Sequence, residues 1–280
     1  MGTLYVVGTP IGNMEDITFR QLETLKNVDF IAAEDTRVTL KLLNRFEISK
    51  QLVSFHGHSS RSCAENIVAR IENGENAAIV TDAGMPCISD PGEILVRICA
   101  QKGIDVKVVP GPSAVVSALA ISGLDTSRFA FEGFLSMTKK QRTQRLESIK
   151  NDSRTLIFYE APHKLRATLE DLYRYLGNRR IALCRELTKI YEEVLRMTLS
   201  EAIAYYEAAN PKGEFVLVVE GASPDDSMEE LTEEQAVDLV KALVSKGKKL
   251  SDACREIAGQ TKYSKSFLYS EMLREEEEMQ

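Results

Sequence analysis

The sequence lacks long apolar runs. Across its 280 residues, no stretch reaches the length of about 18 apolar residues that a membrane-spanning helix needs. The first residues, MGTLYVVGTPIGN, contain no basic segment followed by a long apolar core, so they do not resemble a signal peptide. We therefore expect a protein that has no membrane partner and is not exported.

Cysteine is scarce, and its spacing follows no known pattern. The five cysteines are Cys63, Cys87, Cys99, Cys184 and Cys254. Their odd number and the absence of a CxxC pair are typical of a reduced, cytoplasmic protein. Two of the three histidines form the pattern His56-x-His58, close to Cys63, which suggests a metal site. Nothing else stands at metal-ligand spacing, so we expect no bound metal.

The sequence also lacks common nucleotide-binding and hydrolase signatures. The loop GTPIGN (8–13) follows an apolar run, but no Gly-Lys-Ser/Thr completes a Walker A loop, and its glycines do not fit GxGxxG. By itself this loop indicates a tight strand-to-helix turn. No GxSxG elbow is present, which argues against a serine hydrolase.

Basic residues are in the minority, and the net charge of −7 argues weakly against general nucleic-acid binding. Two segments depart from this balance. Residues 139–150 carry five basic side chains against Glu147 alone, and residues 241–265 carry seven against two acids. Each segment is either a locally basic binding surface or a solvated helix face, and the sequence leaves both interpretations open.

What the sequence does contain is a regular alternation of apolar strands and amphipathic helices. In the first part of the chain, strands are predicted at 4–8, 28–34, 52–56, 77–82 and 106–111. Helices are predicted at 16–26, 36–46, 60–73, 92–102 and 113–121. This alternation predicts an α/β fold with a largely parallel sheet covered on both faces, and a site outside the carboxyl ends of its strands.

A second set of elements follows a break near 121–134. Strands are predicted at 129–134, 155–161, 181–187 and 214–221, and helices at 139–150, 163–176 and 199–209. The remainder is helical, with a helix-turn-helix-like outline near its end. We therefore predict two α/β domains at 1–120 and 121–222, and a linker with a helical tail at 223–280.

The loop TDAGMPCISDPG (81–92) is the most informative stretch. It is longer than a simple connection needs, stiffened by two prolines and nearly bare of bulky side chains, which lets the backbone approach a small ligand. Asp82 follows the preceding strand and can accept hydrogen bonds from ribose hydroxyls or an ammonium group. The alternative is that Asp82 and Asp90 only cap turns or the next helix.

Other chemistry-bearing side chains follow other strands. AEDTR places Glu34, Asp35 and Arg37 at a strand end, where they can equally well pair with one another. SFHGHS adds His56 at the next strand end. In PGPSA, Ser113 opens a helix either as a cap or by leaving free N–H groups for a ligand.

Taken together, these stretches resemble one family. LYVVGTPIGN, IAAEDTR, TDAGMPCISDPG, VVPGPSA, FEGFL, FYEAPHKL, CREL and KGEFVLVVEG occur in the order seen in RsmI-type ribosomal RNA small-subunit methyltransferases, which have the tetrapyrrole-methylase fold. The resemblance covers nearly all of 1–221 and, more loosely, the tail. It implies two α/β domains with a cleft between them, plus a small C-terminal helical domain. It also implies S-adenosylmethionine as cofactor, homodimers, and methylation of one cytidine ribose 2′-oxygen in the decoding region of 16S rRNA of the 30S subunit.

The resemblance further implies a cofactor site shared by both α/β domains. Its residues here would be Pro10, Ile11, Asp82, Ala83, Gly84, Met85, Ser113, Ala114, Tyr159, Leu187 and Gly213. S-adenosylmethionine carries no phosphate and needs no lysine-bearing phosphate loop. It needs close backbone contact and an acid for its hydroxyls or ammonium group, which the TDAG turn can supply.

Methyl transfer to a ribose hydroxyl benefits from a general base. The candidates are Asp35, His56, Glu160 and His163, with Glu160 or His163 preferred, and the sequence does not choose between these two. Contacts to RNA phosphates are predicted for Arg37, Lys139, Lys140, Arg142 and Lys164.

Two alternatives stay open. One is a methylase of the same fold acting on a small corrinoid or tetrapyrrole precursor, although such enzymes usually begin with a Gly-x-Gly-Pro-Gly loop and lack the tail. The other is a non-catalytic ribosome-binding protein. The chain also departs from the family's pattern, because Thr81, Met85 and Cys87 replace the usual residues of SDAGTPLISDPG. In addition, SMTKK follows GFL where a proline and a basic residue are usual.

Overall fold

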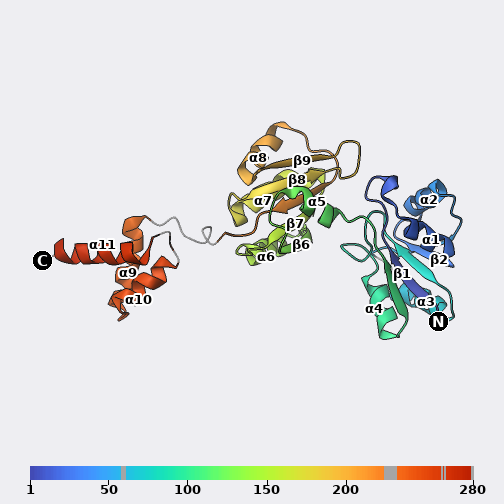
Figure 1. Ribbon diagram of the computed structural model, residues 1–280, viewed down its shortest axis with the longest axis horizontal. Helices are drawn as coiled ribbons and strands as arrows, with labels where there is room; N and C mark the ends of the chain where they lie inside the picture. The colour runs from blue at the N-terminus through green and yellow to red at the C-terminus, as the bar shows by residue number, and fades with distance from the viewer. Residues whose placement is uncertain (58–60, 224–231, 260, 262, 279–280) are drawn as a thin grey trace.

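The computed structural model describes the chain except for residues 58–60, 224–231, 260, 262 and 279–280. Two α/β bodies and a helical tail follow one another along its long axis (Figure 1). We call the part that contains the first sheet, from β1 to β5, the first body. The part from α5 to β10 is the second body, and α9 to α11 form the helical tail.

The first body is a parallel sheet with helices on both faces. Its strands are β1 (Thr3–Val7), β2 (Phe30–Ala33), β3 (Gln51–Ser54), β4 (Ala77–Val80) and β5 (Asp105–Val109). Its helices are η1 (Met14–Asp16), α1 (Phe19–Asn27), α2 (Thr36–Arg45), α3 (Arg61–Glu72) and α4 (Glu93–Gln101). The strand order is β3-β2-β4-β1-β5, and all neighbours are parallel, which confirms the predicted sheet.

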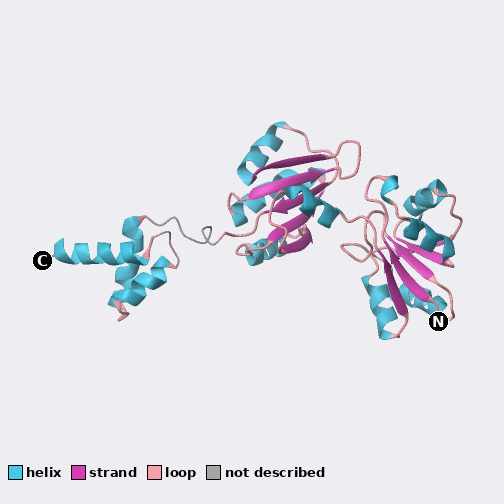
Figure 2. Ribbon diagram, viewed as in Figure 1, coloured by secondary structure: helices cyan, strands magenta, loops and turns pink. Residues whose placement is uncertain are grey.

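The core of the first body lies on both sides of this sheet. β2 and β4 are the continuous runs FIAA and AAIV, buried at every residue, as is typical of central parallel strands. Leu25 of α1 packs with Ile31 on one face, and Leu95 of α4 packs with Phe30 on the other (Figure 2). The carboxyl ends of β1, β2 and β4 therefore meet along one edge of a rigid, buried sheet.

The second body has a mixed sheet. Its strands are β6 (Phe129–Phe134), β7 (Thr155–Glu160), β8 (Arg180–Arg185), β9 (Glu193–Thr198) and β10 (Phe215–Val219). Its helices are α5 (Ala114–Ser122), α6 (Lys139–Ile149), η2 (Pro162–Lys164), α7 (Leu165–Leu176) and α8 (Leu199–Ala208). The order is β6-β7-β10-β8-β9; β6 and β7 are parallel, and the other pairs are antiparallel.

Two features of the second body differ from the expectations. β9 is a strand that the sequence analysis does not predict: EVLRMT mixes charged and apolar residues, and its pairing with β8 makes it a strand. The boundary predicted after residue 120 lies inside α5. Val115 and Leu119 of this helix share a cluster with Ile157 of the second sheet, so the chain crosses between the bodies before α5 begins.

The helical tail consists of α9 (Glu233–Ser245), α10 (Leu250–Ala258) and α11 (Lys265–Glu278). It has a small core of its own, in which Val240, Cys254 and Leu268 bring the three helices together. α10 and α11 give the helix-turn-helix-like outline that the sequence predicts. In the part of the chain that the structure describes, no helix combines the length and the hydropathy needed to cross a bilayer.

Candidate active site

Three loops of the first body, those after β1, β4 and β5, touch one another at the carboxyl edge of its sheet. The backbone amide of Thr9 donates to the Gly84 carbonyl at 2.8 Å, and the Gly84 amide donates to the Thr9 carbonyl at 3.1 Å. A Cβ atom on Gly8 would come within 2.8 Å of Gly111 Cα and of Met85 Sδ. Glycine at position 8 therefore lets the three loops meet backbone to backbone.

The loop 81–92 is held in a strained conformation. Cys87 and Ser89 have φ angles of 72° and 61°, in the left-handed region that residues other than glycine rarely adopt. Such positions cost of the order of 1–3 kcal/mol each and cluster at ligand sites. Gly92 has a φ of 129°, and a Cβ there would come within 2.6 Å of Cys87 Sγ. The loop thus has one tightly packed conformation, although two of its residues disfavour it.

Three carboxyl groups lie around Thr81 at the start of this loop. The Thr81 hydroxyl donates to Glu34 Oε2 at 2.5 Å, and the backbone amide of Asp35 donates to Asp82 Oδ1 at 3.1 Å. Burial, together with the charge of Glu34, raises the pKa of Asp90 to about 6. Partial desolvation and the same neighbour also raise the pKa of Asp82. This concentration of negative charge favours a ligand group that is cationic or donates hydrogen bonds.

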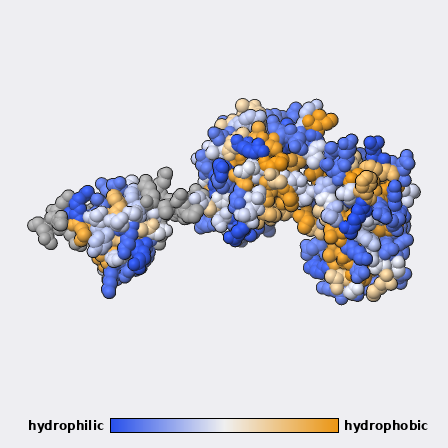
Figure 3. Space-filling model, in the orientation of Figure 1, coloured by the Kyte–Doolittle hydropathy of each residue, from blue (hydrophilic) through white to orange (hydrophobic). Residues whose placement is uncertain are grey.

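A cavity of about 500 Å³ opens between these loops and the strand ends of the second body. Figure 3 shows apolar residues gathered where the two bodies meet. Nine of the residues predicted to bind the cofactor line the cavity: Ile11, Asp82, Ala83, Gly84, Met85, Ser113, Ala114, Tyr159 and Leu187. Of the described residues that were predicted for this role, Pro10 and Gly213 do not line it.

Gly213 instead shapes a loop beside the cavity. Its φ is 80°, and a Cβ there would come within 2.5 Å of Glu186 Cγ. Lys189, which lines the cavity, donates to Glu186 Oε1 at 2.9 Å and to Glu214 Oε2 at 3.0 Å. Gly12 of the first body lies against this loop, because a Cβ on it would come within 2.6 Å of Lys189 Cγ. The two bodies therefore touch along this side of the cavity.

Glu160 is the predicted base that lies in the cavity wall. It ends β7, and only 4% of its surface is exposed. Its Oε1 accepts from the Ala161 amide at 2.8 Å, and its Oε2 accepts from the Thr168 hydroxyl at 2.5 Å. That hydroxyl accepts from Arg142 Nη2 at 2.9 Å, and Arg142 Nε donates to Asp171 Oδ2 at 2.6 Å. A chain of hydrogen bonds thus runs from α6 through α7 to the cavity.

The other three predicted bases do not line the cavity. Asp35 caps α2, and its hydrogen bonds from Arg37 lower the pKa of Asp35 to about 2. His163 is exposed in η2, and His56 is exposed in the loop after β3. His58, the other histidine of the metal pattern, lies outside the described residues. Within the described residues there is no group of three or more metal-ligating side chains.

The residues predicted to contact RNA occupy different environments. Lys139 and Lys140 are exposed in the first turn of α6, and Lys164 is half-buried at the end of η2. Arg37 is exposed but paired at 2.6 Å with the carboxylate that caps α2. Arg142 is half-buried and takes part in the hydrogen-bond chain to Glu160, so its guanidinium is engaged inside the second body.

The cavity wall contains residues that the sequence analysis did not include in the site. They are Glu34, Thr81, Ile88, Asp90, Phe134, Ala161, Pro162, Cys184, Lys189, Glu214, Phe215 and Val216. For Glu34, Thr81 and Asp90 a signal existed, since they belong to two of the polar strand-end loops. For the strand residues of the second body no such signal existed, because the pairing of the strands decides which of them face the cavity.

Comparisons with known proteins agree with this geometry. The family model of the Tetrapyrrole (Corrin/Porphyrin) Methylases matches residues 3–203. A protein of Synechocystis sp. named Ribosomal RNA small subunit methyltransferase I is 48% identical over 270 residues, which are 96% of each chain. The protein of the same name from Thermotoga maritima is 48% identical over 221 residues, which are 79% of this chain and 99% of that one.

Solved structures show the same fold at lower identity. The methyltransferase CobJ matches with a TM-score of 0.61 at 16% identity, covering 83% of this chain and 98% of its own. Diphthine synthase matches with a TM-score of 0.56 at 16% identity, covering 79% of this chain and 90% of its own. The chain, with its two α/β bodies and shared cavity, therefore belongs to the tetrapyrrole methylase family and, within it, to the ribosomal RNA small subunit methyltransferase I proteins.

Proposed function

We propose that this protein methylates the ribose 2′-oxygen of a cytidine in the decoding region of 16S rRNA, within the 30S particle, with S-adenosylmethionine as methyl donor. The observation that carries the proposal is the cavity in which glycine-rich loops and carboxyl groups of the first body face Glu160 of the second. Relatives that are 48% identical and named for methylation of small-subunit ribosomal RNA support the substrate class.

The cavity fits the cofactor in size and chemistry. Its volume of about 500 Å³ lies inside the range of roughly 300–1,000 Å³ that is usual for small-molecule sites. Ile11 and Leu187 supply apolar walls, and Gly84 brings bare backbone to the surface of the cavity. The carboxylates of Asp82 and Asp90 suit ribose hydroxyls or the amino group of the methionine portion. When bound, S-adenosylmethionine supplies a methyl group activated by a positively charged sulfur.

Glu160 is the residue that we assign as general base. A ribose hydroxyl is a weak nucleophile, and a positioned carboxylate that takes up its proton accelerates the transfer. The hydrogen bonds from Ala161 and Thr168, one to each oxygen, hold the carboxylate plane in a single orientation. Glu160 then accepts the proton of the 2′-hydroxyl as that oxygen bonds to the methyl carbon, and the remaining demand is alignment of the substrate.

The RNA would reach the cavity past the exposed side chains of Lys139 and Lys140, with Lys164 close to Glu160 in the chain. These ammonium groups suit phosphate oxygens, which position RNA without reading its sequence. Assembly as a homodimer and a cytoplasmic location complete the proposal. Light scattering of the purified protein tests the first, and imaging of a tagged protein in the cell tests the second.

The decisive test is methylation of 30S subunits isolated from cells that lack an enzyme of this type. Purified protein with radiolabelled cofactor should incorporate one methyl group per particle, and mass mapping should place it on a cytidine ribose of the decoding region. Glu160→Gln should lower kcat by at least 100-fold, while Glu147→Gln, an exposed acid on α6, should leave it unchanged. Incorporation into a tetrapyrrole precursor but not into rRNA would overturn the proposal.

A further inference from the structure

A β-bulge in β6 brings two phenylalanines to the same face of the second sheet. Phe131 pairs with Ile157 and Phe134 pairs with Tyr159, so three steps along β6 match two along β7. In a regular strand, residues three apart point to opposite faces. The extra residue removes this difference, and Gly133 makes the turn with a φ of 65°. The bulge therefore determines where the Phe134 ring lies.

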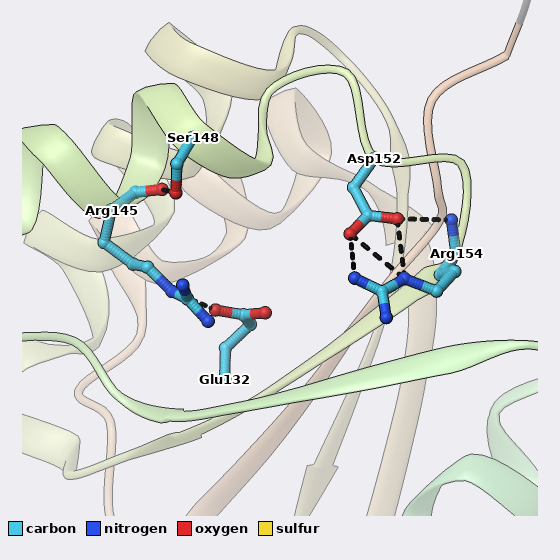
Figure 4. Close-up of polar contacts among 5 residues, drawn as sticks. All are labelled: Glu132, Arg145, Ser148, Asp152 and Arg154. Atoms are coloured by element: carbon cyan, nitrogen blue, oxygen red, sulfur yellow. Dashed lines mark hydrogen bonds and ion pairs between the residues drawn. The ribbon is translucent and has the colours of Figure 1, made fainter.

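The other face of the bulge is fixed by an ion pair. Glu132 is the extra residue, and its side chain, only 2% exposed, accepts from Arg145 Nε of α6 (Figure 4). Near this pair, Arg154 binds Asp152 through both carboxylate oxygens. The bulge is thus a braced feature of the sheet and holds its phenylalanines in place.

The result is an aromatic surface at the mouth of the cavity. The ring of Tyr159 lies 5.0 Å from that of Phe131 and 5.5 Å from that of Phe134, centroid to centroid. Phe134 lines the cavity yet is 59% exposed, and Ile88, on the loop of the first body, lines the same cavity and is 52% exposed. Two large apolar side chains left uncovered at a site are typical of a surface that a ligand covers.

We propose that Phe134 is the stacking surface for the base of the target nucleotide, which leaves its RNA stack to enter the cavity. This inference rests on the proposed function. RNA enzymes and readers hold unstacked bases on aromatic rings, and an enzyme that acts on one nucleotide must compensate the lost stacking. Phe134 pairs with Tyr159, the chain neighbour of Glu160, so a base on this ring places its own ribose beside the proposed general base.

The competing occupant of the ring is the adenine of the cofactor, and the absence of tryptophan from the chain permits a direct test. Phe134→Trp introduces a single tryptophan at the proposed surface of the full-length protein. Titration with S-adenosylmethionine should leave its emission nearly unchanged. Strong quenching that saturates with the cofactor would place adenine on this ring and overturn the proposal.

Kinetics on 30S subunits give the second arm. Phe134→Leu keeps apolar bulk but not the aromatic face, and it should lower kcat/KM for 30S by about 10- to 100-fold, the loss expected for one base stack. Its calorimetric affinity for S-adenosylmethionine should stay within about twofold, and Phe134→Trp should retain most of the activity. Phe129→Leu, at the other end of β6 and 41% exposed, is the matched control.

The outcomes separate the two levels of the argument. An unmodified protein that methylates no rRNA contradicts the proposed function. An active protein whose Phe134→Leu variant keeps the kcat/KM of the Phe129→Leu control contradicts the stacking role alone. A loss of cofactor affinity in Phe134→Leu, with unchanged circular dichroism, also contradicts it.

Discussion

Thr168 donates a hydrogen bond to Glu160 at 2.5 Å and so ties α7 to the end of β7 at the wall of the cavity. The same hydroxyl accepts from Arg142. A threonine has one hydroxyl hydrogen, and because an arginine can only donate, that hydrogen must point to the carboxylate. The direction of the chain is therefore fixed from the cation to the proposed base.

Removing the Thr168 hydroxyl should impair catalysis more than binding. Thr168→Val keeps the shape of the side chain but leaves one Glu160 oxygen without its donor and Arg142 without an acceptor. We expect kcat to fall by about 10-fold and unfolding free energy to fall by about 1–3 kcal/mol, as for an unsatisfied buried polar group. Thr168→Ser should restore both. Single-turnover methylation and urea unfolding measure them, and a Val variant with normal kcat would show that the hydroxyl does not position Glu160.

Arg142 should act on stability and not on RNA affinity. Arg142→Ala leaves Asp171 without its partner, so we expect a loss of about 1–3 kcal/mol in unfolding free energy. The log-log salt slope of 30S binding should stay at its original value. Lys139→Ala with Lys140→Ala should reduce that slope by about 2, one per phosphate contact, with little change in stability. Filter binding from 50 to 300 mM salt compares the variants, and a reduced slope for Arg142→Ala would return this residue to the RNA surface.

The backbone contact at Gly8 should tolerate no side chain. Gly8→Ala places a Cβ within 2.8 Å of Gly111 Cα and Met85 Sδ, so the loops that form the cavity must move apart. We expect affinity for S-adenosylmethionine to drop by at least 10-fold, and overpacking to lower stability by about 1–3 kcal/mol. Gly57→Ala is the control, because nothing lies within 4 Å of a Cβ there. Calorimetry that finds equal affinities would refute the tight-contact argument.

The pKa of Asp90 predicts how stability depends on pH. This pKa is about 6 in the folded chain, because burial and Glu34 raise it, and about 3.9 in the unfolded chain. Between these values the folded state binds more protons, so this group makes stability fall as pH rises from about 4 to 6. Asp90→Asn should remove this contribution.

Thermal unfolding without cofactor checks the prediction. The melting temperature of Asp90→Asn should exceed that of the unmodified protein at pH 7.5, and the difference should vanish near pH 3.5. The variant should also bind S-adenosylmethionine more weakly at pH 7.5, because the ionised carboxylate is lost. A melting difference that is equal at both pH values would contradict the raised pKa.

The first sheet and its loops could be predicted from the sequence because their signals are local. β2 and β4 are short apolar runs bounded by polar residues, and a parallel sheet brings the segments after them to one edge. Asp82 and Gly84 follow from this logic alone. β9 and the position of α5 could not be predicted, because each depends on a partner elsewhere in the chain: β8 for the strand, and the second sheet for the helix.

The chain's own residues determined the strand-helix alternation, the bare turn at 81–92 and the family to which they belong, since each depends on short-range pattern. Only the tertiary structure decided that Arg142 supports Glu160 and that Phe134 faces the cavity. Both outcomes come from contacts between segments far apart in sequence or from one extra residue in a strand. A local pattern contains no information about which distant group will be in reach, and packing settles that choice.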